Sequence, residues 1–406
     1  MVELLQQVRL IDPIAQQDQV TDVLINQGQI QAIAPTELPP GIEIITNQGL
    51  ILAPALVDLY SHSGEPGFPE RETLLSLREA ARRGGFAQVA VLPDTDPPLD
   101  HPAVLRLIHQ ADTGCLTCWG ALTKAGRGEQ MAELAALAEF GVVGFTDGQP
   151  ISNLGLLRRL LEYAQPFNKP IALALGDRQL QGNGVMREGL SSLLLGLPGQ
   201  PDYAETAYLA AVLEMIAAIG TPVHLMRIST ARSVELIANA KARRLPITAS
   251  VTWMHLLHTS QDLVGYDPNL RLQPPLGDPA DRQALLQGLR DGVIDAIAID
   301  HSPYTYAEKT VAFGEAPPGA IGLELALPLL WQLLVETATL SAPQLWQSLS
   351  SNPSQILHHK STQLILFDPQ APWLVTPASL KSQAHNTPWL GKQLTGRVVK
   401  IYPSPQ

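Results

Sequence analysis

The chain has 406 residues, of which 45% are hydrophobic and 16% are charged, and its formal net charge is −11. This composition excludes a nucleic-acid binder with a basic face, and no apolar run approaches the roughly 18 residues that span a membrane. The N-terminal segment MVELLQQVRLID lacks the order of a signal peptide, so we expect a cytoplasmic protein. Its length allows one large core and a smaller second unit.

Short strands separated by turns are the pattern of the first fifty residues. The strand-like segments are QVRLIDP, QVTDVLINQG, QIQAIAP and EIITNQG, and turn residues close each of them. Alone they are too few to bury a core, so they require a partner from elsewhere in the chain.

From residue 53 to residue 357, apolar runs alternate with helix-like stretches. The runs are LILAPALVDLY (50–60), FAQVAVLPD (86–94), CLTCWGALT (115–123), GVVGFTD (141–147), PIALALGD (170–177), TPVHLMRIS (221–229), PITASVTW (246–253) and GVIDAIAID (292–300). Between them, segments such as ETLLSLREAARRGG carry apolar residues at helical spacing and end on glycine. Eight buried strands, each followed by a helix, predict an α/β fold, a (β/α)8 TIM barrel over residues 53–357.

The last fifty residues return to strand-like text, with QLILFDP, PWLVTP and GRVVKIYP. Since both ends of the chain are β-rich and short, we predict that residues 1–52 and 358–406 form one small β-sandwich domain beside the barrel.

In such barrels the chemistry lies where the strands end, at the carboxyl face. The polar residues at these ends are Asp58, Tyr60, His62, Asp94, Lys124, Asp147, His224, Arg227, His255, Asp300 and His301. Residues i and i+2 of a strand share a face, so a metal-binding pair would read His-x-His. The first strand instead ends with Tyr60 and His62. Two interpretations stay open, a metal site without one ligand and an ordinary strand end.

Several ordered segments carry a family likeness, among them GLILAPALVDLYSHSGEPG, AARRGGFAQVAVLPDTDP, GVMREGLSSLLLGLPGQPDYAE, QPPLGDPADRQALLQGLRDGVIDAIAIDHSPYTYAEK and NTPWLGKQLTGRVV. Through them the chain resembles the dihydroorotases of the amidohydrolase superfamily, in the version related to allantoinase, along nearly its whole length. The resemblance implies a barrel of the amidohydrolase type with the composite sandwich. It also implies a place in de novo pyrimidine biosynthesis, where the family interconverts N-carbamoyl-aspartate and dihydroorotate.

The family's reaction depends on a metal centre, usually two zinc ions, because zinc lowers the pKa of bound water to about 7 and polarises the carbonyl group. At three of the family's ligand positions this sequence has other residues, namely Tyr60, Ala174 and Arg227. The family's residue types remain at His62, Asp147 and Asp300, and Asp300 corresponds to the acid that moves the proton. A phenol is a poor ligand, alanine is none, and arginine brings a fixed positive charge.

The substrate side also departs from the family. Gly64 stands where an arginine would grip a carboxylate, and Asp94 stands where the family has asparagine. We therefore expect no cofactor; the alternative is a single zinc ion on His62, Asp147 and Asp300.

Arg227 suggests what replaces the metal. Without a cation, Asp147 and Asp300 would be partly buried carboxylates with no compensating charge, which is costly. We hypothesise that Arg227 forms a salt bridge with Asp147, with Asp300 or with both.

The resemblance leaves two kinds of function to compare. The favoured one is a non-catalytic dihydroorotase-like protein that acts as the assembly partner of aspartate transcarbamoylase, since metal-deficient relatives do so. The alternative is an active or altered cyclic amidohydrolase that uses one residual metal. No nucleic acid or membrane partner is expected, and a homodimer is the oligomer that the resemblance suggests.

Overall fold

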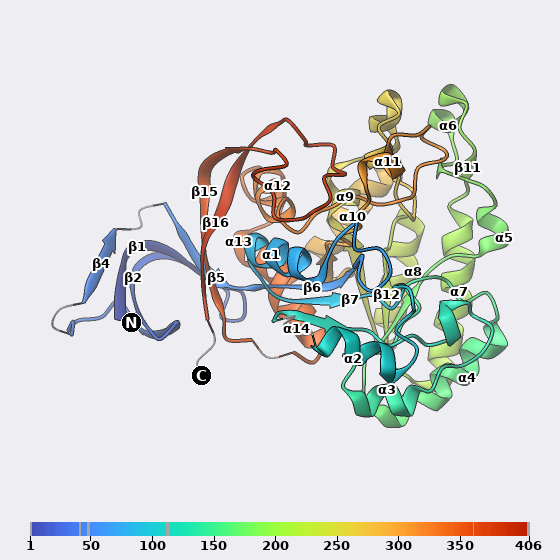
Figure 1. The fold of residues 1–406 in the computed structure, drawn as a ribbon, viewed down its shortest axis with the longest axis horizontal. Helices are drawn as coiled ribbons and strands as arrows, with labels where there is room; N and C mark the ends of the chain where they lie inside the picture. Colours follow the sequence, from blue (N-terminus) through green and yellow to red (C-terminus); the bar gives the residue numbers. More distant parts are fainter. Residues whose placement is uncertain (1, 40–41, 47–48, 111–113, 360, 404–406) are drawn as a thin grey trace.

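A computed structural model describes residues 2–39, 42–46, 49–110, 114–359 and 361–403. Figure 1 shows a β-sheet domain at one end and a barrel wrapped by helices at the other. Among the described residues, no helix combines the length and apolar character needed to cross a lipid bilayer.

The sheet domain is built from both ends of the chain. Its strands are β1 (Val2–Asp12), β2 (Gln17–Asn26), β3 (Gln29–Ile33), β4 (Glu43–Thr46), β5 (Ile51–Pro54), β15 (Leu364–Leu374) and β16 (Gln393–Tyr402). They follow the order β16-β15-β5-β1-β2-β3, and β4 also pairs with β1. In the antiparallel pair β15–β5, Leu366 lies opposite Leu52, and both side chains enter one core with Leu5 and Tyr402. The predicted β-domain formed by both termini is therefore confirmed.

The barrel strands are β6 (Leu56–Ser61), β7 (Phe86–Val91), β8 (Leu116–Cys118), β9 (Ile171–Ala174), β12 (Val223–Met226), β13 (Ile247–Thr252) and β14 (Ala296–Ala298). They form the parallel series β6-β7-β8 and β14-β13-β12-β9. Phe145 connects the two series through single bridges to Gly120 and Ile171, so the fourth predicted run contributes bridges in place of a full strand. The ring closes where the Asp300 N–H donates to the Tyr60 carbonyl at 3.1 Å.

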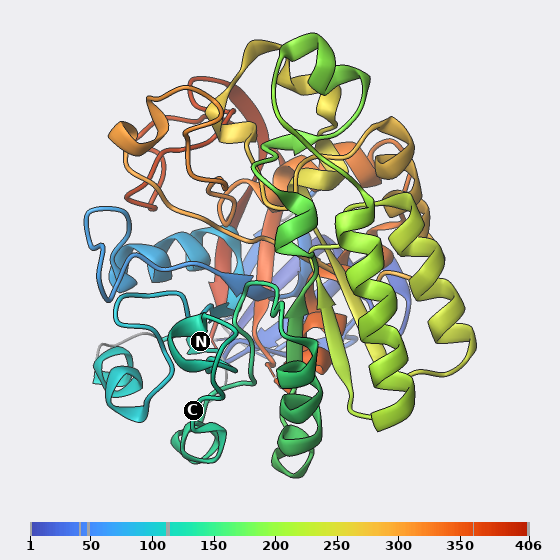
Figure 2. The ribbon, with the colours of Figure 1, turned by 90° about the vertical axis from the view of Figure 1, so that its right-hand side faces the viewer.

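Helices cover the outside of the barrel, and α4, α7 and α8 stand together in Figure 2. The longer ones are α1 (Leu74–Gly84), α2 (Pro102–Gln110), α3 (Leu134–Phe140), α4 (Leu154–Ala164), α7 (Tyr203–Ile219), α8 (Ala231–Ala242) and α10 (Pro279–Arg290). The shorter ones are α5 (Arg178–Gln181), α6 (Leu190–Leu195), α9 (Trp253–Leu257), α11 (Tyr306–Lys309), α12 (Ala326–Leu330), α13 (Ala342–Trp346) and α14 (Asn352–Ile356), and β10 (Met186–Arg187) pairs with β11 (Gly199–Gln200). Gly85 caps the C-terminus of α1 and Gly220 that of α7, and both glycines have a left-handed backbone, as the sequence predicts.

The first apolar run divides between the two domains. Ile51–Pro54 pairs with β15, and Leu56–Ser61 enters the barrel beside β7. Between them, the carbonyl of Ala55 accepts a hydrogen bond from the Ser350 hydroxyl at 2.7 Å, and that of Pro54 accepts one from the Trp346 indole at 3.1 Å. These bonds satisfy the backbone where the chain leaves one sheet for the other.

Candidate functional site

The candidate residues surround a cavity of about 120 Å³ at the carboxyl ends of the strands, which we call the barrel-mouth cavity. Its lining includes one residue at or just beyond the end of each of five strands: His62, Asp94, Ala174, Arg227 and Asp300. The barrel thus brings together residues that are up to 238 positions apart, counted from His62 to Asp300.

Arg227 and Asp300 form a two-pronged salt bridge. The Arg227 Nε lies 2.8 Å from Asp300 Oδ2, and its Nη2 lies 2.6 Å from Asp300 Oδ1. The remaining nitrogen, Nη1, donates to the carbonyl of Gly148 at 2.8 Å. All three guanidinium nitrogens are engaged, which is the geometry that makes arginine–carboxylate pairs strong.

The backbone also fixes this pair. Arg227 has φ 55 and Asp300 has φ 52, the left-handed region that costs free energy for residues other than glycine. Such conformations persist only where the surrounding structure holds them, so both partners are set by the fold.

His62 extends the pair into a line of alternating charges. Its Nδ1 lies 2.5 Å from Asp94 Oδ2, and its Nε2 lies 3.5 Å from Asp300 Oδ1. Burial disfavours the imidazolium, but Asp94 and Asp300 more than offset it and raise the pKa of His62 to about 9. We call Asp94, His62, Asp300 and Arg227 the four-charge network; its formal charges cancel at neutral pH.

The two carboxylates of this network stay ionised. Although burial opposes ionisation, Arg227 and His62 hold the pKa of Asp300 below its usual range. His62 and Arg227 lower the pKa of Asp94 in the same way. A doubly protonated His62 has no lone pair for a metal ion, so in this state it is a hydrogen-bond donor only.

Tyr60 lies below the network, inside the barrel. Its side chain is fully buried and packs with Trp119 and Met226. The phenol oxygen accepts from the Arg227 N–H at 3.1 Å and lies 2.9 Å from Ser250 Oγ. The Arg227 guanidinium carbon is 5.1 Å from the centre of the Tyr60 ring, within cation–π range. Tyrosine therefore supports the arginine from beneath.

Of the two salt bridges hypothesised for Arg227, the one with Asp300 forms and the one with Asp147 does not. The ion pairs of Arg227 among the described residues include Asp300 and not Asp147. Asp147 accepts from the Thr123 N–H at 2.9 Å and from the Thr123 hydroxyl at 2.5 Å, both within the protein interior. Burial raises the pKa of Asp147 to about 6 despite these bonds. Threonine donors thus satisfy this carboxylate locally, which removes the need for a guanidinium.

Ala174 and Gly64, the other two positions at which the sequence differs from the family expectation, present no ligand atom. Ala174 ends β9 and offers only a methyl group to the cavity wall. At Gly64 an added Cβ would lie 2.4 Å from the backbone oxygens of both Phe68 and Glu72. The loop after β6 has therefore closed over the place where a larger side chain would stand.

A two-zinc centre of the family type does not fit these residues. Nitrogen donors are missing at Tyr60 and Ala174, and the cationic Nη2 of Arg227 lies 3.4 Å from the His62 Nε2. In the described ranges, no group of three or more His, Cys, Asp and Glu side chains is arranged to hold a metal ion. The chemistry of this donor set favours ion pairing over coordination.

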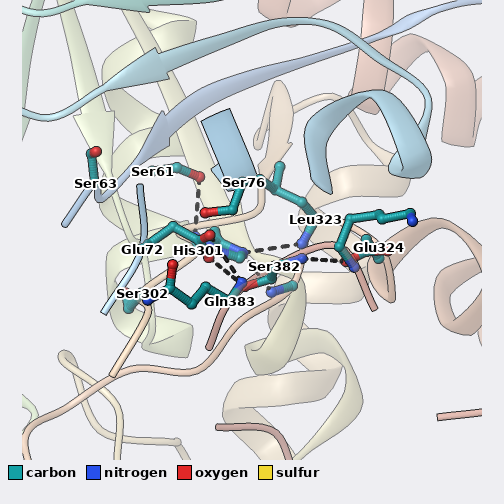
Figure 3. A network of polar contacts seen from close by, with 12 residues as sticks. Ser61, Ser63, Glu72, Ser76, His301, Ser302, Leu323, Glu324, Ser382 and Gln383 are labelled. Atoms are coloured by element: carbon teal, nitrogen blue, oxygen red, sulfur yellow. Dashed lines mark hydrogen bonds and ion pairs between the residues drawn. The ribbon is translucent and has the colours of Figure 1, made fainter. Parts of the chain in front are cut away.

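A second polar network lies behind His301, and sequence reasoning missed it (Figure 3). The His301 Nδ1 accepts from the Gly322 N–H at 3.2 Å, so its Nε2 carries the proton that faces Glu72 at 3.4 Å. Glu72, fully buried, also accepts from the Ser382 hydroxyl and from the Gln383 N–H. Although burial opposes ionisation, these donors and His301 hold the pKa of Glu72 below its usual range.

This network has a structural role. It joins the loop after β6, the end of β14 and the segment between β15 and β16. Its members stand far apart in the sequence, and Ser382 belongs to a segment with no motif. The only sequence feature that could have indicated this network is a glutamate directly before the N-terminal cap of a helix.

Comparison with known proteins places this geometry in a family. The profile of the dihydro-orotase-like family matches residues 49–233. A probable dihydroorotase-like protein of Synechocystis sp. is 44% identical over 97% of this chain and 98% of that protein. The dihydroorotase of Pelotomaculum thermopropionicum is 37% identical over 95% of this chain and 93% of that enzyme.

Solved structures agree on the fold. The L-hydantoinase (dihydropyrimidinase) from Arthrobacter aurescens superposes with a TM-score of 0.84 at 18% identity, over 99% of this chain and 95% of that one. The D-hydantoinase from Thermus sp. gives a TM-score of 0.80 at 18% identity, over 98% and 93%. The predicted TIM barrel with its β-sandwich is confirmed. The chain belongs to the dihydroorotase-like family.

Proposed function

We propose that this chain is a non-catalytic dihydroorotase-like protein of de novo pyrimidine biosynthesis that acts as a structural partner of aspartate transcarbamoylase. The observation that carries the proposal is the position of Arg227. Its guanidinium binds Asp300 with two hydrogen bonds, at the barrel mouth where the family holds a metal ion. Asp300 is thereby engaged as an anion and is not available to move a proton.

The partner follows from the family's place in the pathway. Aspartate transcarbamoylase makes the N-carbamoyl-aspartate that dihydroorotases take up, and the resemblance implies that metal-deficient members assemble with it. A fold retained without its catalytic groups is consistent with a role for the surface. A homodimer of this chain is a compatible building block for such a complex.

The alternative is an amidohydrolase with one residual zinc on His62, Asp147 and Asp300. One observation favours it: the barrel-mouth cavity remains open above His62 and Asp300. Against it stand the Thr123 bonds of Asp147 and the cationic neighbour of His62.

Two measurements on the purified full chain decide between them. Zinc content and the interconversion of dihydroorotate and N-carbamoyl-aspartate, with zinc or manganese added, test the catalytic reading; we expect neither metal in stoichiometric amount nor turnover. Native mass spectrometry of the chain mixed with aspartate transcarbamoylase tests the assembly reading. We expect a joint complex, and two independent species at micromolar concentrations would contradict the proposed partner.

A further inference from the structure

A second cavity opens at the opposite end of the barrel from the network. This base cavity has a volume of about 460 Å³. It lies at the amino ends of β9, β12 and β13, against α14, and its lining includes Ile171, Val223, Ile247, His224 and Thr248. Family chemistry belongs to the carboxyl ends of the strands, so the base cavity is separate from the candidate site.

The two charged side chains in the wall of the base cavity, Lys169 and Asp295, are both hydrogen-bonded within the protein. Lys169 donates to the carbonyl of Val142 at 2.6 Å, and Asp295 is held by Lys241 at 2.7 Å and by the Ala249 N–H. The other polar groups of the wall are amides, hydroxyls and the imidazoles of His224 and His358, and prolines and aliphatic side chains cover the rest. Such a wall suits an uncharged molecule with a flat or apolar body.

A hydrogen-bond chain runs from the network down to this cavity, and the buried Tyr60 hydroxyl gives it a direction. The Tyr60 oxygen accepts from the Arg227 N–H, and Ser250 Oγ, at 2.9 Å, is the one acceptor that the Tyr60 hydroxyl has among the described residues, so this hydroxyl donates to Ser250. The Ser250 hydroxyl then donates to His224 Nε2 at 2.9 Å. Burial lowers the pKa of His224 to about 3, so the ring is neutral.

The direction leaves one donor at the end of the chain. With Nε2 accepting, the neutral His224 carries its proton on Nδ1 and donates it to Thr248 Oγ1 at 2.9 Å. The Thr248 hydroxyl hydrogen then has no acceptor among the residues for which the structure gives a placement, and Thr248 lines the base cavity. An acceptor on a ligand in the cavity would pair with this hydroxyl.

We propose that the base cavity binds a small uncharged molecule whose carbonyl oxygen accepts a hydrogen bond from Thr248, such as a carboxamide or lactam on a flat ring. This site is independent of the proposed assembly role. Binding there adds an acceptor to a chain that ends on the backbone of Arg227, so a ligand at the base contacts the same series of hydrogen bonds that supports the mouth.

Saturation-transfer NMR on the full chain tests the site with nicotinamide, an uncharged carboxamide, and with nicotinate, an anion of nearly the same shape. We expect nicotinamide to bind with a Kd on the order of 1 mM, as is typical of such small ligands, and nicotinate to bind at least about tenfold more weakly. Equal binding of the two probes, or no saturable signal from nicotinamide, would overturn the proposal.

Matched variants on β13 locate the bound probe. Thr248→Val removes the donor at constant shape and should weaken nicotinamide binding about tenfold, and Thr248→Ser should retain it. Thr252→Val makes the same change at the barrel-mouth cavity and should have no effect. Loss of binding in Thr252→Val with retention in Thr248→Val would show that the probe binds at the barrel mouth and would contradict the proposal.

Nitrogen-15 NMR of His224 in the unsubstituted chain tests the direction of the hydrogen-bond chain. We expect the proton on Nδ1; a proton on Nε2 would reverse the chain and remove the free Thr248 donor.

Discussion

Arg227 and Asp300 carry opposite charges that are largely withdrawn from water, with side-chain exposures of 8% and 16%. Removing one partner of such a pair leaves the other buried and uncompensated. We expect Arg227→Met to lower the free energy of unfolding by about 3 kcal/mol, near the low end for buried pairs because His62 still faces Asp300. The double variant Arg227→Met/Asp300→Asn should recover part of the loss in urea denaturation. If Asp300→Asn lowered the free energy of unfolding by the same amount in the Arg227→Met background as in the natural chain, the two residues would not be coupled.

His62 makes the stability of the network depend on pH. Its folded-state pKa of about 9 lies above the ordinary histidine value, so the folded chain binds the proton more tightly than the unfolded chain does. The stabilisation is complete below the unfolded pKa and is lost as the pH rises through about 9. We expect the stability difference between the natural chain and His62→Gln to shrink between neutral pH and pH 10. Proton NMR should place the His62 midpoint near 9; a midpoint at or below the ordinary value would contradict the network.

At the scale of elements, the loop between β6 and α1 is closed against any side chain at Gly64. A methyl group there would lie 2.4 Å from two backbone oxygens, and backbone cannot yield as a flexible side chain can. We expect Gly64→Ala to cost about 1 to 3 kcal/mol in the free energy of unfolding, as overpacked sites do. Gly265→Ala is the control, because nothing lies within 4 Å of its added Cβ. Equal stability of the two variants would show that the loop is not closed.

The elements themselves were largely predictable, since buried strands and glycine-terminated helices leave local patterns. The run at 141–147 was predicted as a strand, yet only Phe145 forms bridges, because pairing depends on neighbours that a single segment does not encode. The sequence limited the expected salt-bridge partner of Arg227 to two acidic residues, Asp147 and Asp300. The choice between them depends on the left-handed backbone at Asp300 and on the Thr123 donors of Asp147, and neither leaves a pattern in the sequence.

At the scale of the whole molecule, the barrel mouth is held by internal ion pairs between residues that follow four separate strands. Asp94 follows β7, His62 follows β6, Arg227 follows β12 and Asp300 follows β14. Their charges cancel without an added cation, and Tyr60 fills the interior beneath them. The charges at the barrel mouth are therefore balanced by the protein's own side chains. In a metal-dependent barrel, metal ions balance them.

This internal charge balance at the barrel mouth predicts how the stability of the protein responds to chelators. A ligand that binds only the folded state stabilises it, so removing a bound metal lowers the melting temperature of a metal-dependent fold. We expect EDTA to leave the melting temperature of this chain unchanged in differential scanning calorimetry. The matched control is the triple variant Tyr60→His/Ala174→His/Arg227→His, which restores imidazoles around His62 and should melt at a lower temperature once EDTA removes added zinc. A fall in the natural chain as large as that of the zinc-loaded variant would mean that an ion, and not Arg227, balances Asp300.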